Sequence, residues 1–437
     1  MNGRSHRANV VRLDPTPAQE SDIRDVARRV SALWNVANYE CRQRFLAKAG
    51  VPSYSRLCAL VAQHSLYRSL PSDVAQEVLK KVSEAWRSYF GLRKKWAAGE
   101  LPDKPGLPRY RKDRRTGEYR EDFVPIKHDR SYEVAARAVS VVLPRDLRER
   151  HGGRLAVAYR GQRRYTGEGG RAEVGYDAGR GRWYFRWSVA WEVAADRPHA
   201  RAAGIDLGVR VLASVSVEGS PVATHFSGRE VLKDWDYFGR RIAAHQRGLA
   251  HRGRKSSRRL RRLHQRRRGR LVHAWEVIAA QIVRRLKREK VGLVYIGWPK
   301  DIRRERSYGA LWNGRVHNFW SFELALRILE KHLRRARIRV ERVGERGTSS
   351  TCPMDEHPVE KTHDVVRAPR HVLSCKTCGH RIHSDQAGSR NILRFQKPGV
   401  SWDGLEASPG TETLRWQHHR WVDSVNQCHD VALPRAA

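Results

Sequence analysis

Apolar residues recur at helical spacing through the first hundred residues of the chain. Thr16 and Pro17 begin a capping box, and the apolar positions after them lie three and four residues apart. A second run of this kind begins at Asp73, and a shorter one lies between the two. These patterns predict a helical module over residues 15–100, whose tryptophan and tyrosine side chains fill its core rather than stack on bases.

Short runs of alternating apolar and polar residues follow a junction that is rich in proline and glycine. The last of these runs, Arg182 to Trp191, alternates aromatic and basic residues. Together with an apolar strand near the amino terminus, the runs predict a small antiparallel β-barrel. We assign this barrel to residues 1–14 and 101–200, so that the helical module is an insertion in it.

Strands and helices alternate in the second half of the chain. Ala203 to Val217 predicts two strands joined by a turn, while Val291 to Gly297 and Ile338 to Val343 predict two more. A helix is expected over residues 317–336, between the last two strands. Strands separated by helices favour an α/β core with a partly parallel sheet.

Asp206 is the carboxylate within the first of these strand pairs. Burial of a carboxylate is costly unless a cation or hydrogen-bond donors meet it. Taken alone, Asp206 fits a turn residue that caps a hairpin better than it fits a metal ligand. Motifs near the carboxyl end of the chain decide between these two interpretations.

Two cysteines near that end have the spacing of zinc ligands held on a tight turn. The partner half of such a knuckle offers a third cysteine, but Asp355 stands where a fourth is expected. Imidazole suits zinc beside thiolates better than a carboxylate does. The predicted structural zinc ligands are Cys352, His357, Cys375 and Cys378. His363 and Asp355 remain alternatives for the fourth ligand, and a knuckle without metal is the competing interpretation.

A formal net charge of +40 at pH 7 and a pI of about 10.9 set these 437 residues apart from ordinary enzymes. Such a chain repels itself unless a polyanion neutralises it, which favours a nucleic-acid partner. A membrane surface is the alternative, but no apolar run reaches transmembrane length. Because the amino terminus lacks an apolar signal segment and six cysteines make no disulfide framework, we expect a cytoplasmic protein.

Basic residues are concentrated between Arg252 and Arg270, inside a region with helical periodicity at 234–290. A charge run is usually a solvated face or a disordered arm. Leu260 and Leu263 lie at helical spacing within it, which favours a helical hairpin that follows phosphates without reading bases. The candidate nucleic-acid contacts are Arg254, Lys255, Arg258, Arg259, Arg261, Arg262, Arg266 and Arg267.

Four motifs, taken in order, carry a family resemblance. Asp206 lies in "GIDLG", the two halves of the knuckle contain "TSSTCP" and "CKTCG", and Asp385 lies in "SDQAGSRNIL". Each motif is weak alone, but their order and spacing resemble the RuvC-like domain of the TnpB family. That family comprises transposon-encoded RNA-guided nucleases and the miniature type V CRISPR effectors related to them.

The resemblance implies an α/β ribonuclease H-like (RuvC) nuclease domain with an inserted zinc knuckle. The nuclease core would comprise residues 201–346 and 380–395, and the knuckle would comprise residues 347–379. The amino-terminal barrel would be the family's wedge domain, with the helical module as its recognition insertion. Residues 396–437 are polar, and we expect them to form a weakly ordered tail.

The resemblance also implies carboxylates that bind two Mg²⁺ ions. Asp206 and Asp385 match the family's first and last acidic positions. Members commonly carry a middle glutamate at a strand end, where this chain has Gly297. Glu345 lies at the end of the next strand, where parallel-sheet proteins place functional groups, and some members resemble this displaced arrangement. Glu345 is therefore the predicted third ligand, with a solvated loop glutamate as the alternative.

Two other acids near the missing position fit less well. Asp301 follows Pro299 and precedes two arginines, which places it outside the sheet. Glu341 has Arg339 and Arg342 as neighbours, and we expect it to form a surface ion pair.

The function implied is that of an RNA-guided DNA endonuclease. A guide RNA would pair with target double-stranded DNA, and the protein would read only a short motif beside the target. An RNA-guided DNA-binding protein that blocks transcription without cutting is the alternative, because Gly297 binds no metal. An unguided junction resolvase would leave the amino-terminal module unexplained. The motifs do not separate a transposon origin from a CRISPR origin, and they leave the oligomeric state open.

Overall fold

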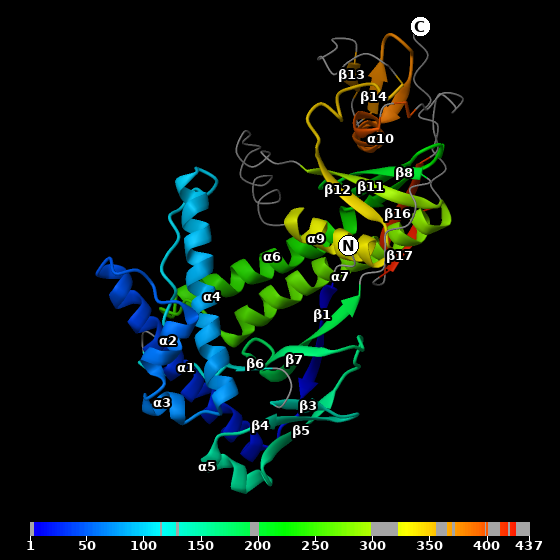
Figure 1. Cartoon of the computed structure of the whole chain (residues 1–437). Coiled ribbons are helices and arrows are strands. Elements are labelled where there is room, and N and C mark those ends of the chain that lie inside the picture. Colours follow the sequence, from blue (N-terminus) through cyan, green and yellow to red (C-terminus); the bar gives the residue numbers. More distant parts are fainter. Residues whose placement is uncertain are drawn as a thin grey trace. The chain divides into compact units, whose positions relative to one another are not determined.

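A computed structural model describes residues 4–113, 116–127, 131–192, 201–298, 322–354, 365–368, 372–397, 399–400, 411–417 and 420–424. The chain divides into two compact units, residues 1–193 and 194–437 (Figure 1). Within the ranges above, no helix is both long and apolar enough to cross a membrane.

The helical module of the first unit consists of α1 (Pro17–Leu46), α2 (Tyr54–Val61), α3 (Ser65–Arg68) and α4 (Ser72–Ala97). The Thr16 hydroxyl accepts a hydrogen bond from the Gln19 amide, and the Gln19 side chain accepts one from the Thr16 amide. The predicted capping box is therefore present. Trp86 is buried in the core, where its indole nitrogen donates to Asn38 Oδ1 over 3.0 Å.

The strands of the first unit are β1 (Arg4–Leu13), β2 (Phe123–Ile126), β3 (Tyr132–Val134), β4 (Ala138–Val142), β5 (Arg154–Arg160), β6 (Gly169–Asp177) and β7 (Arg182–Glu192). The short helices α5 (Arg145–Arg148) and η1 (Glu149–His151) precede β5. The sheet order is β2-β6-β7-β1-β5-β4-β3, and neighbouring strands are antiparallel. The first strand therefore joins the later ones, as the barrel prediction requires.

The outer strand β3 comes close to β6, the second strand from the opposite edge, without forming a ladder in the part of the chain that is described. Tyr132 on β3 donates its hydroxyl to the carbonyl oxygen of Gly170 on β6 over 2.8 Å, and its ring packs on Phe185. The sheet is thus strongly curled, and a closed barrel stays a prediction.

The second unit is built on a mixed sheet of β8 (Arg201–Asp206), β9 (Val211–Val217), β10 (Ala223–Ser227), β11 (Val291–Trp298), β12 (Arg339–Gly344), β16 (Thr411–Gln417) and β17 (Arg420–Ser424). Its order is β12-β11-β8-β9-β10-β16-β17. Strand β11 is parallel to both β8 and β12, whereas β9 is antiparallel to β8. The predicted α/β core with a partly parallel sheet is confirmed.

Helices cover both faces of this sheet: α6 (Arg229–Ala250), α7 (Arg258–Arg288), α9 (Phe322–Arg335) and α10 (Ser384–Gln396). Because side chains alternate along a strand, Ala203 and Ile205 of β8 join the large core with α7 and α9. Ala202 points the other way and packs with Leu393 of α10. In Figure 1, α10 accordingly lies on one side of the sheet, and α7 and α9 lie on the other.

The prediction of a weakly ordered tail from residue 396 onward is wrong for residues 411–417 and 420–424. Strand β16 pairs in parallel with β10, and β17 pairs with β16 as the sheet edge. The physical reason is the alternation in β16, which buries Leu414 and Trp416 in the large core while charged neighbours stay outside. Sequence distance hid this pairing, because the partner strand lies near the start of the unit.

The knuckle region forms a separate small sheet of β13 (Val365–Ala368), β14 (Val372–Cys375) and β15 (Arg381–His383). Its order is β13-β14-β15, and both pairs are antiparallel. Helix α10 begins directly after β15, so the knuckle leads without a linker into the helix that carries Asp385.

Candidate functional site

Asp206 ends β8 on the face of the sheet that α10 covers. Ala202 and Gly204 precede it on that face, since side chains two apart point the same way. A Cβ on Gly204 would collide with the carbonyl oxygen of Ser389 in α10. The small residues of β8 therefore allow the helix backbone to lie directly against the strand.

Helix α10 presents its first turns to Asp206. Asp385 is the second residue of the helix, and Gly388 follows one turn later on the same side. A Cβ on Gly388 would lie 2.6 Å from Asp206 Oδ2, so only glycine leaves room for that carboxylate. Asp385 lies close enough that its charge raises the pKa of Asp206. The helix thus brings the two aspartates of the sequence motifs together.

Glu345 occupies the space that a side chain at position 297 would fill. Strands β11 and β12 pair with Gly297 opposite Val343, and Glu345 lies two residues beyond Val343 on the same face. A Cβ on Gly297 would lie 3.0 Å from Glu345 Oε2 and 2.7 Å from Ile392 Cδ1. The Glu345 side chain therefore lies over Gly297, the position at which the resembled family usually has a glutamate.

Burial and mutual repulsion shape the protonation of these acids. The pKa of Asp206 is raised well above its ordinary value, first by burial and then by the charges of Asp385 and Glu345, although the Leu207 amide donates to it. Burial raises the pKa of Glu345 to about 7. Three carboxylates thus converge in one partly buried place, where burial and mutual repulsion favour their protonated forms.

The same arrangement fits divalent cations. Oε2 of Glu345 is buried and has no hydrogen-bond partner among the atoms that the structure describes. Carboxylate oxygens are the ligands that Mg²⁺ prefers, and clustered acids without a matching protein cation are the usual setting for such ions. Glu341 does not compete for this role, because it is paired with Arg339 at 2.7 Å, as predicted. Asp301 lies outside the described residues.

Polar side chains that the sequence motifs did not single out lie behind the acids on the same face. Ser389 of α10 bonds Ser214 at 3.0 Å and Ser216 at 2.7 Å, so two strand residues meet one helix hydroxyl. His225 on β10 is buried against His383, with ring centroids 5.0 Å apart. The signal that could have found the serines is the alternation of Ser214 and Ser216 with apolar residues in β9, which marks a polar face.

The knuckle brings together the three cysteines of the predicted zinc site. The Sγ atoms of Cys352, Cys375 and Cys378 all lie within 4.8 Å of one another, and those of Cys352 and Cys378 are 3.6 Å apart. Tetrahedral zinc with Zn–S bonds of about 2.3 Å requires sulfur pairs about 3.8 Å apart, so the cluster could bind zinc. His357, the predicted fourth ligand, lies outside the described residues, as do its alternatives Asp355 and His363.

The basic run forms the turn after α6 and the first part of α7, which packs on α6, rather than a disordered arm. Leu260 and Leu263 of α7 are buried against Phe238, Ile242 and Leu249 of α6. The predicted contact residues are exposed on α7 and on the turn before it, with one exception. The exposed members are Arg254, Lys255, Arg258, Arg259, Arg261, Arg262 and Arg266.

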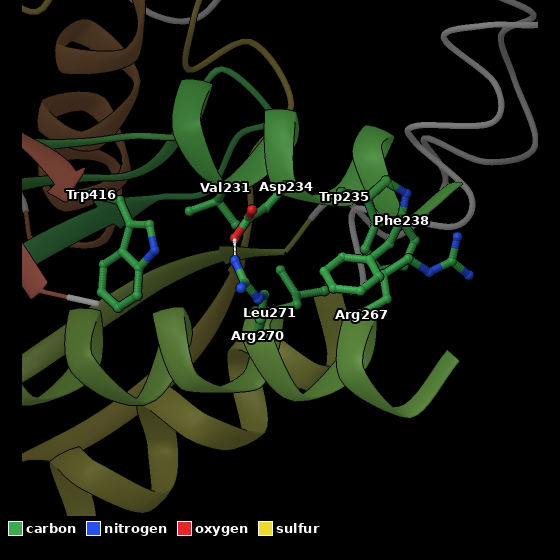
Figure 2. A pocket seen from close by; sticks show the side chains of 8 residues that line it. All are labelled: Val231, Asp234, Trp235, Phe238, Arg267, Arg270, Leu271 and Trp416. Atoms are coloured by element: carbon green, nitrogen blue, oxygen red, sulfur yellow. Dashed lines mark hydrogen bonds and ion pairs between the residues drawn. The ribbon is translucent and has the colours of Figure 1, made fainter. Parts of the chain in front are cut away.

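The exception is Arg267, which takes part in packing between the two helices (Figure 2). Its guanidinium lies 4.0 Å from the ring centroid of Trp235, and Arg270 beside it pairs with Asp234 at 2.6 Å. The pocket between these residues and Trp416 has a volume of about 10 Å³, close to the minimum for one water molecule. The contact between α6 and α7 is therefore tightly packed here, and it leaves no room for a nucleic-acid base.

Two family models match segments of the chain that lie mostly in the second unit. The family model of a probable transposase of the OrfB_IS605 type matches residues 187–303, and the Cas12f1-like TNB domain matches residues 322–392. A TnpB-like protein, ORF457 of Acidianus two-tailed virus, is 29% identical over 424 residues, which cover 89% of this chain and 86% of that protein. The chain is thus similar to a TnpB-like protein over most of its length, and two of its segments match models of a probable transposase and of a miniature type V effector domain.

Solved structures similar to this chain include two CRISPR effectors. The mini-RNA-guided endonuclease CRISPR-Cas_phi3 has a TM-score of 0.49 and 10% identity, with 91% of this chain and 94% of that chain covered. The Cas12f1–sgRNA–target DNA complex has a TM-score of 0.36 and 16% identity, with 90% and 100% covered.

Proposed function

We propose that this chain is a TnpB-type RNA-guided DNA endonuclease with a RuvC-like site formed by Asp206, Glu345 and Asp385. The observation that carries the proposal is the position of Glu345, whose carboxylate lies over Gly297 and next to the two aspartates. A chain that had lost cleavage with its usual glutamate would have no reason to hold another buried acid there. The arrangement therefore supports cutting over the silent DNA-binding alternative.

The three acids would hold two Mg²⁺ ions on the α10 face of the sheet. When bound, such a pair supplies activation of the attacking water and stabilisation of the leaving oxygen in phosphodiester hydrolysis. The protein's own contribution is to fix the carboxylates: Gly204 and Gly388 admit α10 against β8, and Gly297 admits Glu345. Asp206 ends a strand, Asp385 lies in the first turn of a helix and Glu345 directly follows β12, so regular elements hold or adjoin all three acids.

The remaining features fit the nucleic-acid partners that the similar proteins suggest. The exposed arginines of α7 would bind guide RNA or target DNA through phosphates, which provides affinity without reading sequence. The zinc knuckle would hold the chain between Glu345 and α10 in a fixed path. Reading of a short motif beside the target is part of the same proposal, and no residue is assigned to it.

The decisive experiment uses protein purified together with RNA expressed from its own locus. The bound RNA is sequenced, and a plasmid that matches its guide segment is incubated with the complex in Mg²⁺ or in EDTA. Cleavage in Mg²⁺ alone that is lost in both Asp206→Ala and Glu345→Ala, with DNA binding retained, supports the nuclease. Guide-dependent binding without any cleavage would instead support the silent binder, and a preparation free of RNA would contradict both.

A further inference from the structure

Asn391, a buried residue of α10, makes an unusual pair of contacts beside the acidic site. Its side-chain nitrogen donates to the carbonyl oxygens of Thr348 and Thr351, each at 2.8 Å. Both acceptors belong to the segment that follows β12. One amide group therefore ties two points of that segment to the helix that carries Asp385.

The segment held in this way begins at Glu345 and ends at the first zinc cysteine. The Thr348 amide and hydroxyl both donate to the Glu345 carbonyl, at 3.2 and 2.8 Å, and the Thr351 hydroxyl donates to the Gly347 carbonyl at 2.9 Å. These bonds close a compact turn, so a constraint on its two threonine carbonyls is passed to the backbone of Glu345. Cys352 comes directly after the turn and is buried.

Asn391 also lies on the face of α10 that is already committed to the acids. Residues three apart share one side of a helix, so Gly388 adjoins Asp385 on one side and Asn391 on the other. Ile392, next in sequence, contacts the Gly297–Glu345 position. Successive residues along α10 thus contact different parts of the site. Asn391 contacts the backbone turn that follows Glu345.

The buried side chain of Asn391 destabilises the fold through one of its polar atoms, which points to a role other than stability. Its Oδ1 atom is buried and has no hydrogen-bond partner in the described part of the chain. Burial of an unpaired polar atom destabilises the fold, and an apolar residue of similar size would avoid that cost. Only a neutral amide offers two N–H donors to two carbonyls at this distance from the helix, because aspartate offers none when ionised.

We infer that Asn391 is a positioning residue that sets the place of the Glu345 carboxylate relative to Asp206 and Asp385. The inference rests on the proposed function of the acids as ligands of divalent cations. Residues that orient metal ligands through hydrogen bonds typically contribute 10-fold to 100-fold in metal affinity. Loss of the two bonds should therefore weaken cation binding by about tenfold, without removing any ligand.

The test is a titration of the full-length protein with Mn²⁺, followed by calorimetry, in Asn391→Ala and Asn391→Asp. Binding that persists in Asp206→Ala is subtracted as unrelated to the site. The aspartate variant adds a negative charge, which by itself would attract cations, so weaker binding there identifies the lost donors as the cause. Gln386→Ala serves as the control, because this buried amide of the same helix bonds Thr411 on β16 instead.

We expect both Asn391 variants to bind Mn²⁺ about tenfold more weakly at unchanged zinc content, and Gln386→Ala to bind it like wild type while losing thermal stability. Should Asn391→Ala not fold, Asn391→Gln keeps the amide displaced by one methylene and should show the same weakening. Folded Asn391 variants with wild-type Mn²⁺ affinity would overturn the inference. Because the readout is binding, it decides the matter even if wild type cuts no DNA, an outcome that would count against the nuclease alone.

Discussion

The close approach of α10 to Asp206 predicts that Gly388→Ala removes cleavage through a single methyl group. The added Cβ would lie 2.6 Å from Asp206 Oδ2 and 3.0 Å from its Cγ. Neither distance is tolerated, so the carboxylate has to rotate away from the helix. Displacement of a catalytic group by about 1 Å typically costs on the order of 100-fold in rate, and we expect at least that loss in guide-dependent cleavage.

The effect on stability should be much smaller, because two terms oppose each other. Alanine in place of glycine within a helix stabilises by about 1 kcal/mol, whereas overpacking of a filled site costs about 1–3 kcal/mol. The net change is therefore a loss of about 0–2 kcal/mol, part of which is avoided if Asp206 moves. A folded protein with strongly reduced activity is the expected combination.

Gly239→Ala in α6 is the matched control, since a Cβ there has nothing within 4 Å. This variant should gain up to about 1 kcal/mol in the free energy of unfolding and keep full cleavage. Unfolding in guanidinium chloride and single-turnover cleavage of a guide-matched plasmid measure the two quantities. If Gly388→Ala cleaves at the wild-type rate, Asp206 does not need the position that the structure gives it, and the site assignment fails.

Three further predictions concern the acids, the knuckle and the basic helix. In the metal-free folded protein, burial raises the pKa of Glu345 to about 7, whereas the unfolded value is 4.5. The folded state therefore binds this proton more tightly, and the resulting stabilisation is fully present below pH 4.5 and is lost as the pH rises through 7. The free energy of unfolding should fall by at most about 3 kcal/mol over this pH range. Equilibrium unfolding should show this pH dependence in the wild type and not in Glu345→Gln. Cys375→Ser should lower zinc content and destabilise the second unit; unchanged zinc by mass spectrometry would exclude Cys375 as a ligand. Replacement of four exposed arginines by alanine should weaken RNA and DNA binding for every sequence, and it should reduce the slope of log affinity against log salt concentration by about one per lost phosphate contact. The control Arg267→Ala, in the packed contact between α6 and α7, should leave that slope unchanged. The four are Arg258, Arg259, Arg261 and Arg262.

The local chemistry of the chain was readable from the sequence alone. Helical periodicity predicted the packed hairpin of α6 and α7, and the capping box predicted the start of α1. The cysteine spacing predicted a metal cluster of which three members lie together. These features depend on neighbours within a turn or two, where residue type and spacing fix the geometry.

What only the tertiary structure decided depends on contacts between segments that are distant in sequence. The pairing of β10 with β16 turned an expected tail into part of the sheet. The approach of α10 explains why Gly388 and Gly204 are glycines, and the pairing of β11 with β12 explains why Glu345 lies over Gly297. A sequence shows which residues can bury or coordinate, but which of them meet is set by strand register and helix packing, where one residue of shift turns a side chain to the opposite face.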